Sequence, residues 1–174
     1  MNNIFLIGYR CTGKTSVGKA LARQIEWPFM DSDSEITRAC QMTISRMVSK
    51  HGWDFFREKE RETLGQLCGL YSYVIATGGG VILNPQNVSD MQENGAIIWL
   101  KARPETVLER MLQDKITKDQ RPALTSEGFF KETEKTLAVR EPLYEAAKDF
   151  SINTDDLDTD DICRAIIRTL WRTL

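Results

Sequence analysis

The stretch GYRCTGKTS, residues 8–16, follows a short apolar run near the beginning of the chain and precedes apolar residues at helical spacing. It satisfies the pattern G-x-x-x-x-G-K-[S/T] between a predicted strand and a predicted helix, which is the context that a phosphate-binding loop requires. The glycines of such a loop let the backbone wrap a phosphate chain, and N–H groups at the helix N-terminus supply positive potential. The stretch therefore predicts a nucleoside triphosphate site.

Two residues of this loop have specific chemical roles in that prediction. Lys14 can reach the β- and γ-phosphates, and the Thr15 hydroxyl can bind Mg²⁺. An ordinary glycine-rich turn is the alternative, and the strand and helix on either side of the loop argue against it. The residues that we expect to contact the nucleotide are Gly8, Arg10, Cys11, Thr12, Gly13, Lys14, Thr15 and Ser16.

Length and composition limit the other possibilities. The 174 residues, 41% of them hydrophobic, fit one domain with a single core. A net charge of −2 gives no overall attraction to nucleic acid or to an anionic membrane. Four widely spaced cysteines and one histidine argue against a disulfide framework and structural zinc. No apolar run approaches the ~18 residues of a membrane span, so we expect a cytoplasmic protein. We also expect a monomer that acts on a small molecule.

Strand-like runs alternate with longer helical stretches along the chain, and the strands are mostly apolar on both faces. This pattern predicts one three-layer α/β/α domain over residues 1–174, with a doubly wound parallel sheet covered by helices. The predicted strands are residues 3–8, 28–31, 73–80, 96–102 and 149–154. The predicted helices are residues 14–25, 32–49, 55–70, 84–94, 103–115, 129–147 and 159–173.

Residues 113–128, QDKITKDQRPALTSEG, interrupt this alternation because they are polar, lack an apolar face and contain a proline. We predict that they leave the core and close over the reactants as a lid. A solvated loop with no role is the alternative, although an excursion of this length in a compact domain is usually functional or disordered.

Asp31 and Asp33 follow the second predicted strand, at the edge where doubly wound sheets bind ligands. One carboxylate could organise Mg²⁺ while the other accepts a proton from an acceptor hydroxyl. An acidic helix N-cap explains the same two residues, and the sequence alone leaves both explanations open.

Two further clusters have both a functional and a structural interpretation. Arg57 lies in GWDFFREKE, whose aromatic residues are typical of a core and whose charged residues could form a solvated helical face. Three successive glycines at 78–80 follow a buried strand, where they leave backbone N–H groups open to a close ligand or form a flexible turn.

Together these residues resemble the shikimate kinase family over essentially the whole chain, and most closely its bacterial single-domain members. The matching pieces are the phosphate loop at 8–15, DSD at 31–33, FR at 56–57, GGG at 78–80, RPAL at 121–124 and REPLY at 140–144. The resemblance implies a five-stranded parallel sheet like that of nucleoside monophosphate kinases. It also implies transfer of the ATP γ-phosphate to the 3-hydroxyl of shikimate, with Mg²⁺, in aromatic amino-acid biosynthesis.

The resemblance also implies roles for individual residues. Catalysis would involve Lys14, Asp33 and the lid residue Arg121, which reaches the ATP phosphates, while Thr15 and Asp31 would support Mg²⁺. Arg110 would lie beside the adenine. The residues implied for shikimate binding are Asp33, Arg57, Gly78, Gly79, Gly80 and Arg140.

The chain also departs from the family pattern. Tyr9, Cys11 and Thr12 stand where members often have smaller residues and a glycine, and INTDDLDTDD at 152–161 lacks the usual proline against adenine. A gluconate kinase, a nucleoside monophosphate kinase and a non-catalytic P-loop regulatory domain are the alternatives. The missing guanine-reading N-K-x-D pattern disfavours a GTPase, and the retained lysine, threonine, aspartates and Arg57 disfavour a silent domain.

Overall fold

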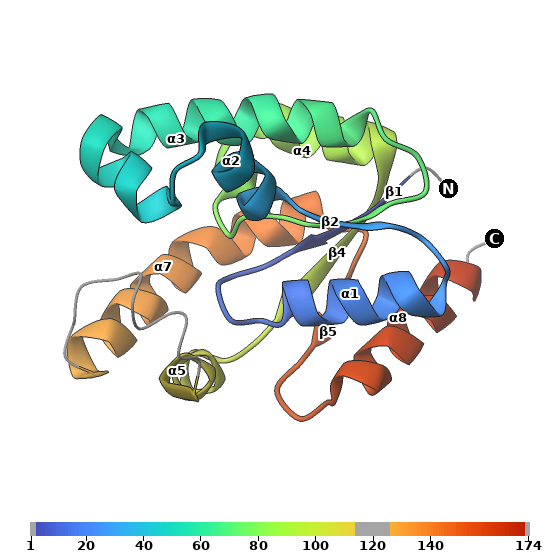
Figure 1. Cartoon of the computed structure of the whole chain (residues 1–174). Helices are drawn as coiled ribbons and strands as arrows, with labels where there is room; N and C mark the ends of the chain where they lie inside the picture. Colours follow the sequence, from blue (N-terminus) through green and yellow to red (C-terminus); the bar gives the residue numbers. More distant parts are fainter. Residues whose placement is uncertain (1–2, 114–125, 173–174) are drawn as a thin grey trace.

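The computed structural model describes residues 3–113 and 126–172, which form a five-stranded parallel sheet between two helical layers (Figure 1). The strands are β1 (Asn3–Ile7), β2 (Phe29–Asp31), β3 (Val74–Ala76), β4 (Gly95–Lys101) and β5 (Phe150–Asn153). The helices are α1 (Lys14–Gln24), α2 (Ser32–Cys40), α3 (Ile44–Cys68), the 3₁₀ helix η1 (Val81–Leu83), α4 (Pro85–Asn94), α5 (Pro104–Gln113), α7 (Ser126–Ala147) and α8 (Thr159–Arg172). The strand order is β2-β3-β1-β4-β5, so β1 lies in the centre.

Alternating side chains of the central strand build a core on each face of the sheet. Ile4 and Leu6 of β1 pack with residues of α1 and α8, whereas Phe5 and Ile7 pack with residues of α3, α4 and the end of α7. Figure 1 shows α1 and α8 below the sheet and α3 and α4 above it. The predicted three-layer fold is therefore confirmed.

Helix boundaries near residues 32–70 differ from the prediction. The predicted helix 32–49 is two helices, because Gln41 has a left-handed φ of 48° and the Thr43 side chain caps α3. The predicted gap at residues 50–54 corresponds to a break in α3 at Gly52, which has a φ of 85°, although helix lies on both sides of that residue. Local capping, rather than hydrophobic spacing, sets these boundaries.

Most of the predicted lid, including Arg121, lies at 114–125, outside the described residues. Helices extend into both ends of the predicted 113–128 segment, because α5 ends at Gln113 and α7 begins at Ser126. Within the described ranges, none of the helices is long and apolar enough to cross a membrane.

Gly95 gives a test of the packing between the strands. It pairs with Asn3 of β1, and a Cβ at Gly95 would lie 2.3 Å from the Asn3 backbone oxygen. Gly95→Ala is expected to lower the free energy of unfolding by about 1–3 kcal/mol, because the new Cβ would meet a backbone oxygen that cannot move independently of the sheet. Urea unfolding followed by circular dichroism measures the change.

Gly65→Ala is the matched control. Gly65 is exposed in α3, and no atom lies within 4 Å of the position its Cβ would take. The substitution is expected to raise the free energy of unfolding by up to about 1 kcal/mol, because alanine favours a helix over glycine. Equal effects of the two substitutions would contradict the proposed close contact at Gly95.

Candidate active site

The phosphate loop connects β1 to α1 at the carboxyl end of the central strand. Gly8 and Gly13 have φ values of 143° and 92°, which favour glycine, and a Cβ at Gly8 would lie 2.4 Å from the Leu100 carbonyl oxygen. Cys11 also has a positive φ, of 57°. Thr12 is buried, and its hydroxyl donates to the Tyr9 carbonyl at 2.9 Å. The loop therefore has a tight backbone fold that only glycine permits at its first position.

Lys14 begins α1 and turns its side chain back onto the loop. Its Nζ donates to the carbonyl oxygens of Gly8 at 2.8 Å and Tyr9 at 2.7 Å. Burial lowers the pKa of Lys14 to about 8, an effect that the Asp33 carboxylate opposes. A desolvated ammonium gains from a further anionic partner, and a nucleotide phosphate is such a partner.

Thr15 and Asp31 are the residues that could hold Mg²⁺. The Thr15 hydroxyl donates to Asp31 Oδ2 at 2.8 Å, and Asp31 Oδ1 accepts the Ser34 N–H at 3.1 Å as the N-cap of α2. The described residues contain no group of three or more His, Cys, Asp or Glu side chains that could hold a metal. A hydroxyl and a carboxylate nevertheless fit Mg²⁺, which typically binds few protein oxygens together with phosphates and water.

Asp33, in the first turn of α2, lies against the glycines that follow β3. A Cβ at Gly78 would lie 2.7 Å from Asp33 Oδ1 and 2.8 Å from Glu60 Oε1. Both oxygens are buried, and within the described part of the chain neither makes a hydrogen bond. Burial and the nearby Asp31 carboxylate raise the pKa of Asp33 to about 6. Asp33 therefore has the basicity of a group that takes a proton near neutral pH.

Glu60 is the site residue that the sequence analysis missed. It is only 2% exposed, and its Oε2 accepts a hydrogen bond from Arg57 Nη1 at 2.5 Å. Burial raises the pKa of Glu60, while the Arg57 charge opposes this shift. Glu60 shares a helical face with buried Phe56 and Leu64, and this spacing is the signal that could have identified it.

Gly80 leaves room for the Arg57 guanidinium, because a Cβ there would lie 2.3 Å from Arg57 Nη2. The same guanidinium lies over the rings of Trp53 and Phe56, at 5.5 Å and 5.1 Å from their centroids. Arg57 is therefore held by an ion pair, two aromatic rings and a glycine backbone. The solvated helical face is the wrong interpretation of Arg57 and Glu60.

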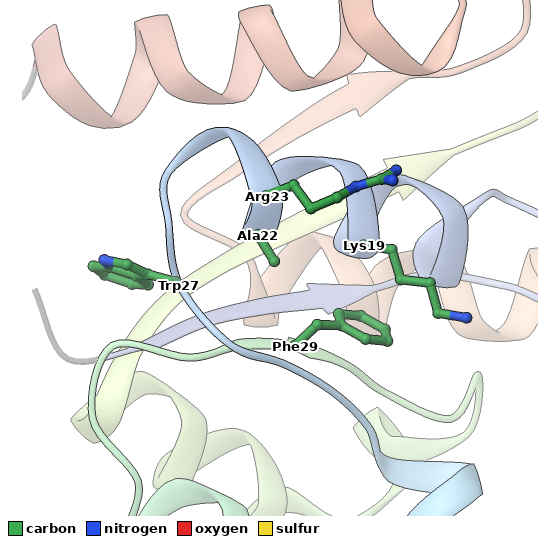
Figure 2. A pocket seen from close by; sticks show the side chains of 5 residues that line it. All are labelled: Lys19, Ala22, Arg23, Trp27 and Phe29. Carbon is green, nitrogen blue, oxygen red and sulfur yellow. The ribbon is translucent and has the colours of Figure 1, made fainter.

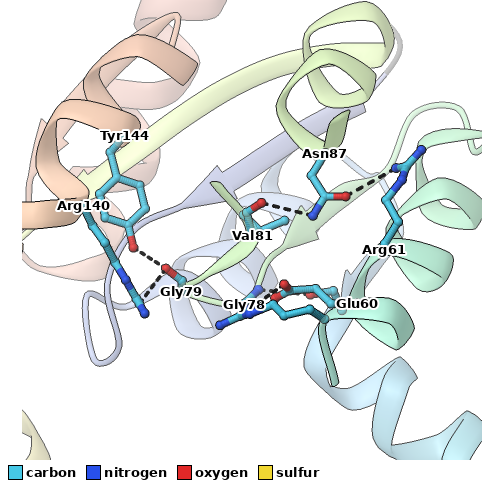
Figure 3. Close-up of polar contacts among 10 residues, drawn as sticks. Glu60, Arg61, Gly78, Gly79, Val81, Asn87, Arg140 and Tyr144 are labelled. Atoms are coloured by element: carbon cyan, nitrogen blue, oxygen red, sulfur yellow. Dashed lines mark hydrogen bonds and ion pairs between the residues drawn. The ribbon is translucent and has the colours of Figure 1, made fainter. Parts of the chain in front are cut away.

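Arg140 and Tyr144 of α7 converge on the Gly79 carbonyl, as Figure 3 shows. Arg140 Nη1 donates to it at 3.1 Å and the Tyr144 hydroxyl at 2.5 Å. Burial raises the pKa of Tyr144 to about 12, so this hydroxyl stays protonated as a donor. On the other side, the Gly78 N–H donates to Ser32 Oγ of α2 at 3.1 Å. The three glycines thus connect α2, α3 and α7.

Arg110 of α5 lies between the phosphate loop and the end of β5. Its guanidinium donates to the Cys11 carbonyl at 3.3 Å, to Thr154 Oγ1 at 3.0 Å and to the Thr154 carbonyl at 2.5 Å. Arg10 pairs with Glu132 of α7 at 3.6 Å, and Ser16 is exposed in the first turn of α1. The predicted residues within the described ranges therefore gather around the carboxyl ends of β1, β2 and β3, with Arg110 reaching from the phosphate loop to the end of β5.

A hollow of about 350 Å³ lies elsewhere, beside α1 and β2 at the edge of the sheet (Figure 2). No predicted site residue lines it. Its lining residues are Lys19, Ala22, Arg23, Trp27 and Phe29.

A sequence model of the shikimate kinase family matches residues 10–171. The chain belongs to the shikimate kinase family. The shikimate kinase of Syntrophus aciditrophicus is 40% identical to it over 174 aligned residues, covering 95% of this chain and 89% of the relative. The solved structure of shikimate kinase from Acinetobacter baumannii in complex with shikimate is 31% identical, with a TM-score of 0.92, and the match covers 99% of this chain and 94% of that one.

Another solved kinase structure resembles this chain at much lower sequence identity. A gluconokinase from Sinorhizobium meliloti matches 99% of this chain and 93% of its own with a TM-score of 0.63, but is 16% identical. At that identity the likeness concerns the fold alone. Membership in the shikimate kinase family therefore rests on the sequence match and on the neighbours of higher identity.

The pKa of Asp33 leads to a test by pH. If Asp33 must be ionised to take the acceptor proton, kcat/KM for the acceptor at saturating ATP should fall about tenfold per pH unit below the Asp33 pKa of about 6 and level off above it. Glu60→Gln removes a negative charge that raises this pKa, so the fall should move to lower pH.

The pH profiles of the wild type and Glu60→Gln are compared. A titration of ATP would have the same midpoint in both enzymes, whereas a titration of Asp33 would not. Circular dichroism at each pH is the control for unfolding. An unchanged midpoint in Glu60→Gln would contradict the assignment of the profile to Asp33.

Proposed function

We infer that the chain transfers the γ-phosphoryl group of ATP to the 3-hydroxyl of shikimate, the reaction of the family to which it belongs. One observation of the structure supports this most strongly. A phosphate loop with Lys14 adjoins a cluster of side chains that combines a carboxylate of raised pKa, Asp33, with the guanidiniums of Arg57 and Arg140. Shikimate has a carboxylate that two arginines can bind and a hydroxyl that one carboxylate can activate.

In the proposed mechanism Asp33 accepts the proton of the 3-hydroxyl while that oxygen bonds to the γ-phosphorus. The bond between the γ-phosphorus and the β–γ bridging oxygen breaks, and ADP leaves. Lys14 exchanges its contacts with the loop carbonyls for phosphate oxygens and stabilises the charge that develops on them. Burial of Asp33 favours its protonated product form, which is consistent with its raised pKa.

Arg57 and Arg140 are proposed to bind the shikimate carboxylate. Glu60 holds Arg57 through the 2.5 Å hydrogen bond, and the Gly79 carbonyl holds Arg140, so both guanidiniums are oriented before the substrate arrives. A preorganised pair loses less side-chain entropy on binding than two mobile arginines would.

Three further assignments complete the proposal. Thr15 and Asp31 would hold Mg²⁺, which neutralises phosphate charge when it is bound. Arg121, outside the described residues, would reach the ATP phosphates, and Arg110 would lie near the adenine. The cysteines are free thiols, which supports a reducing, cytoplasmic location, and we propose that the enzyme acts there as a monomer.

An assay of ADP release tests the function directly. With shikimate, gluconate, a panel of nucleoside monophosphates or no acceptor, release is expected with shikimate alone. Lys14→Ala should remove nearly all of this activity, because the lysine stabilises the transferring group. Activity of Lys14→Ala within about tenfold of wild type, a difference of only ~1.4 kcal/mol in the barrier, would contradict that role.

Asp33→Asn separates proton transfer from substrate binding. The amide keeps the shape of the side chain but cannot take the proton, so kcat should fall by about 10²–10⁴-fold while the Kd for shikimate, measured by calorimetry, stays within a few-fold. Ser34→Ala, on the exposed side of the same helix turn, is the matched control and should behave like wild type. If Asp33→Asn lost binding but kept its kcat at saturation, Asp33 would only hold the substrate.

A further inference from the structure

Tyr9, the second residue of the phosphate loop, lies between Lys14, which is proposed to bind the nucleotide phosphates, and Arg140, which is proposed to bind the acceptor. Its carbonyl oxygen accepts hydrogen bonds from Lys14 Nζ at 2.7 Å and from Thr12 Oγ1 at 2.9 Å. On the acceptor side, a Cβ at Gly79 would lie 3.7 Å from the Tyr9 Cα. The backbone of Tyr9 therefore binds Lys14 and lies close to Gly79, whose carbonyl binds Arg140.

The Tyr9 side chain continues this connection through its ring. It is 2% exposed and packs with Val107 of α5 and Leu137 of α7. The guanidinium of Arg140 lies over the ring, 6.0 Å from its centroid, and that of Arg10 lies 5.0 Å from it. A guanidinium over an aromatic face is attracted by the ring quadrupole, most strongly where water is excluded. The ring thus supports Arg140 from one direction while the Gly79 carbonyl binds its Nη1.

The hydroxyl of Tyr9 contributes less than its ring. The hydroxyl is buried, and among the described residues it has no hydrogen-bond partner. A buried polar group without a partner destabilises the fold. Removal of the hydroxyl should therefore be tolerated, whereas removal of the ring should affect Arg140.

We propose that Tyr9 is a positioning residue that couples the nucleotide and acceptor sites. Its ring orients Arg140 toward the acceptor carboxylate, and its carbonyl binds Lys14 until a nucleotide phosphate replaces it. When Lys14 turns to the phosphate, the Tyr9 backbone loses that partner, and the ring shifts against Arg140. Nucleotide in the loop thus changes the affinity for shikimate, and shikimate changes the affinity for nucleotide by the same factor.

This inference rests on the proposed role of Arg140 in binding the shikimate carboxylate. The test uses calorimetry of shikimate binding with and without saturating ADP, together with the KM values for shikimate and ATP. In the wild type, ADP is expected to change the Kd for shikimate. Tyr9→Leu and Tyr9→Met, which remove the ring but keep an apolar side chain, should bring the ratio of the two Kd values close to one.

The kinetic constants give a second readout. Both ring-deleting variants should raise the KM for shikimate by about threefold to tenfold, the range of a partly buried cation–π contact, and leave the KM for ATP within about twofold. Tyr9→Phe keeps the ring, so its ratio of Kd values for shikimate and its KM for shikimate should both equal those of the wild type. Val107→Ala, which opens a cavity in the same cluster without removing the ring, should lower the unfolding midpoint and keep the Kd ratio.

Several results would overturn the proposal. These are a wild-type Kd ratio of one, an equal rise of both KM values in the ring-deleting variants, or loss of the ratio in Val107→Ala. Arg140→Lys distinguishes the two levels of the inference. If it leaves the KM for shikimate unchanged, the role of Arg140 fails and Tyr9 fails with it. If it raises that KM while the Tyr9 variants do not, only the role of Tyr9 is wrong.

Discussion

After the end of β3, a side chain at Gly78 or Gly80 would displace the charged groups that lie against these glycines, and the arrangement of those groups depends on this constraint. A Cβ at Gly78 would overlap carboxylate oxygens of Asp33 and Glu60, and one at Gly80 would overlap the Arg57 guanidinium. The three side chains come from α2 and α3, and α7 reaches the same glycines through Arg140. The glycine backbone therefore lets three separate helices place charged groups at one point.

The ion pair of Arg57 and Glu60 is better explained by function than by stability. Removing two charges from water offsets most of the attraction that they gain, so a buried pair contributes little net stability. Glu60 is buried beside the equally buried Asp33 oxygen, where it raises the pKa of Asp33. A buried negative charge near Asp33 lowers the stability of the fold. Its two functional roles account for its presence: Glu60 fixes Arg57 and makes Asp33 a better base.

The phosphate loop and the alternation of elements were sufficient to predict the three layers, because both are local patterns. The break at Gln41 was not predictable, since a glutamine in the left-handed region has no signal in composition. Glu60 was missed because REKER has the charge density of a solvated face, although its spacing from Phe56 and Leu64 puts it on the buried face of the helix, where it packs against Gly78. Likewise, Arg140 meets Gly79 across 61 residues of sequence, a contact that the fold alone creates.

Binding of shikimate to Gly80→Ala tests most directly whether the Gly80 backbone positions Arg57. The new Cβ would lie 2.3 Å from Arg57 Nη2, at the end of a flexible side chain, so the fold can adjust while the guanidinium is displaced. We predict that calorimetry shows the affinity for shikimate lowered by about tenfold or more, with the affinity for ADP within about twofold and the unfolding midpoint nearly unchanged. An affinity for shikimate within about twofold of wild type would contradict this positioning.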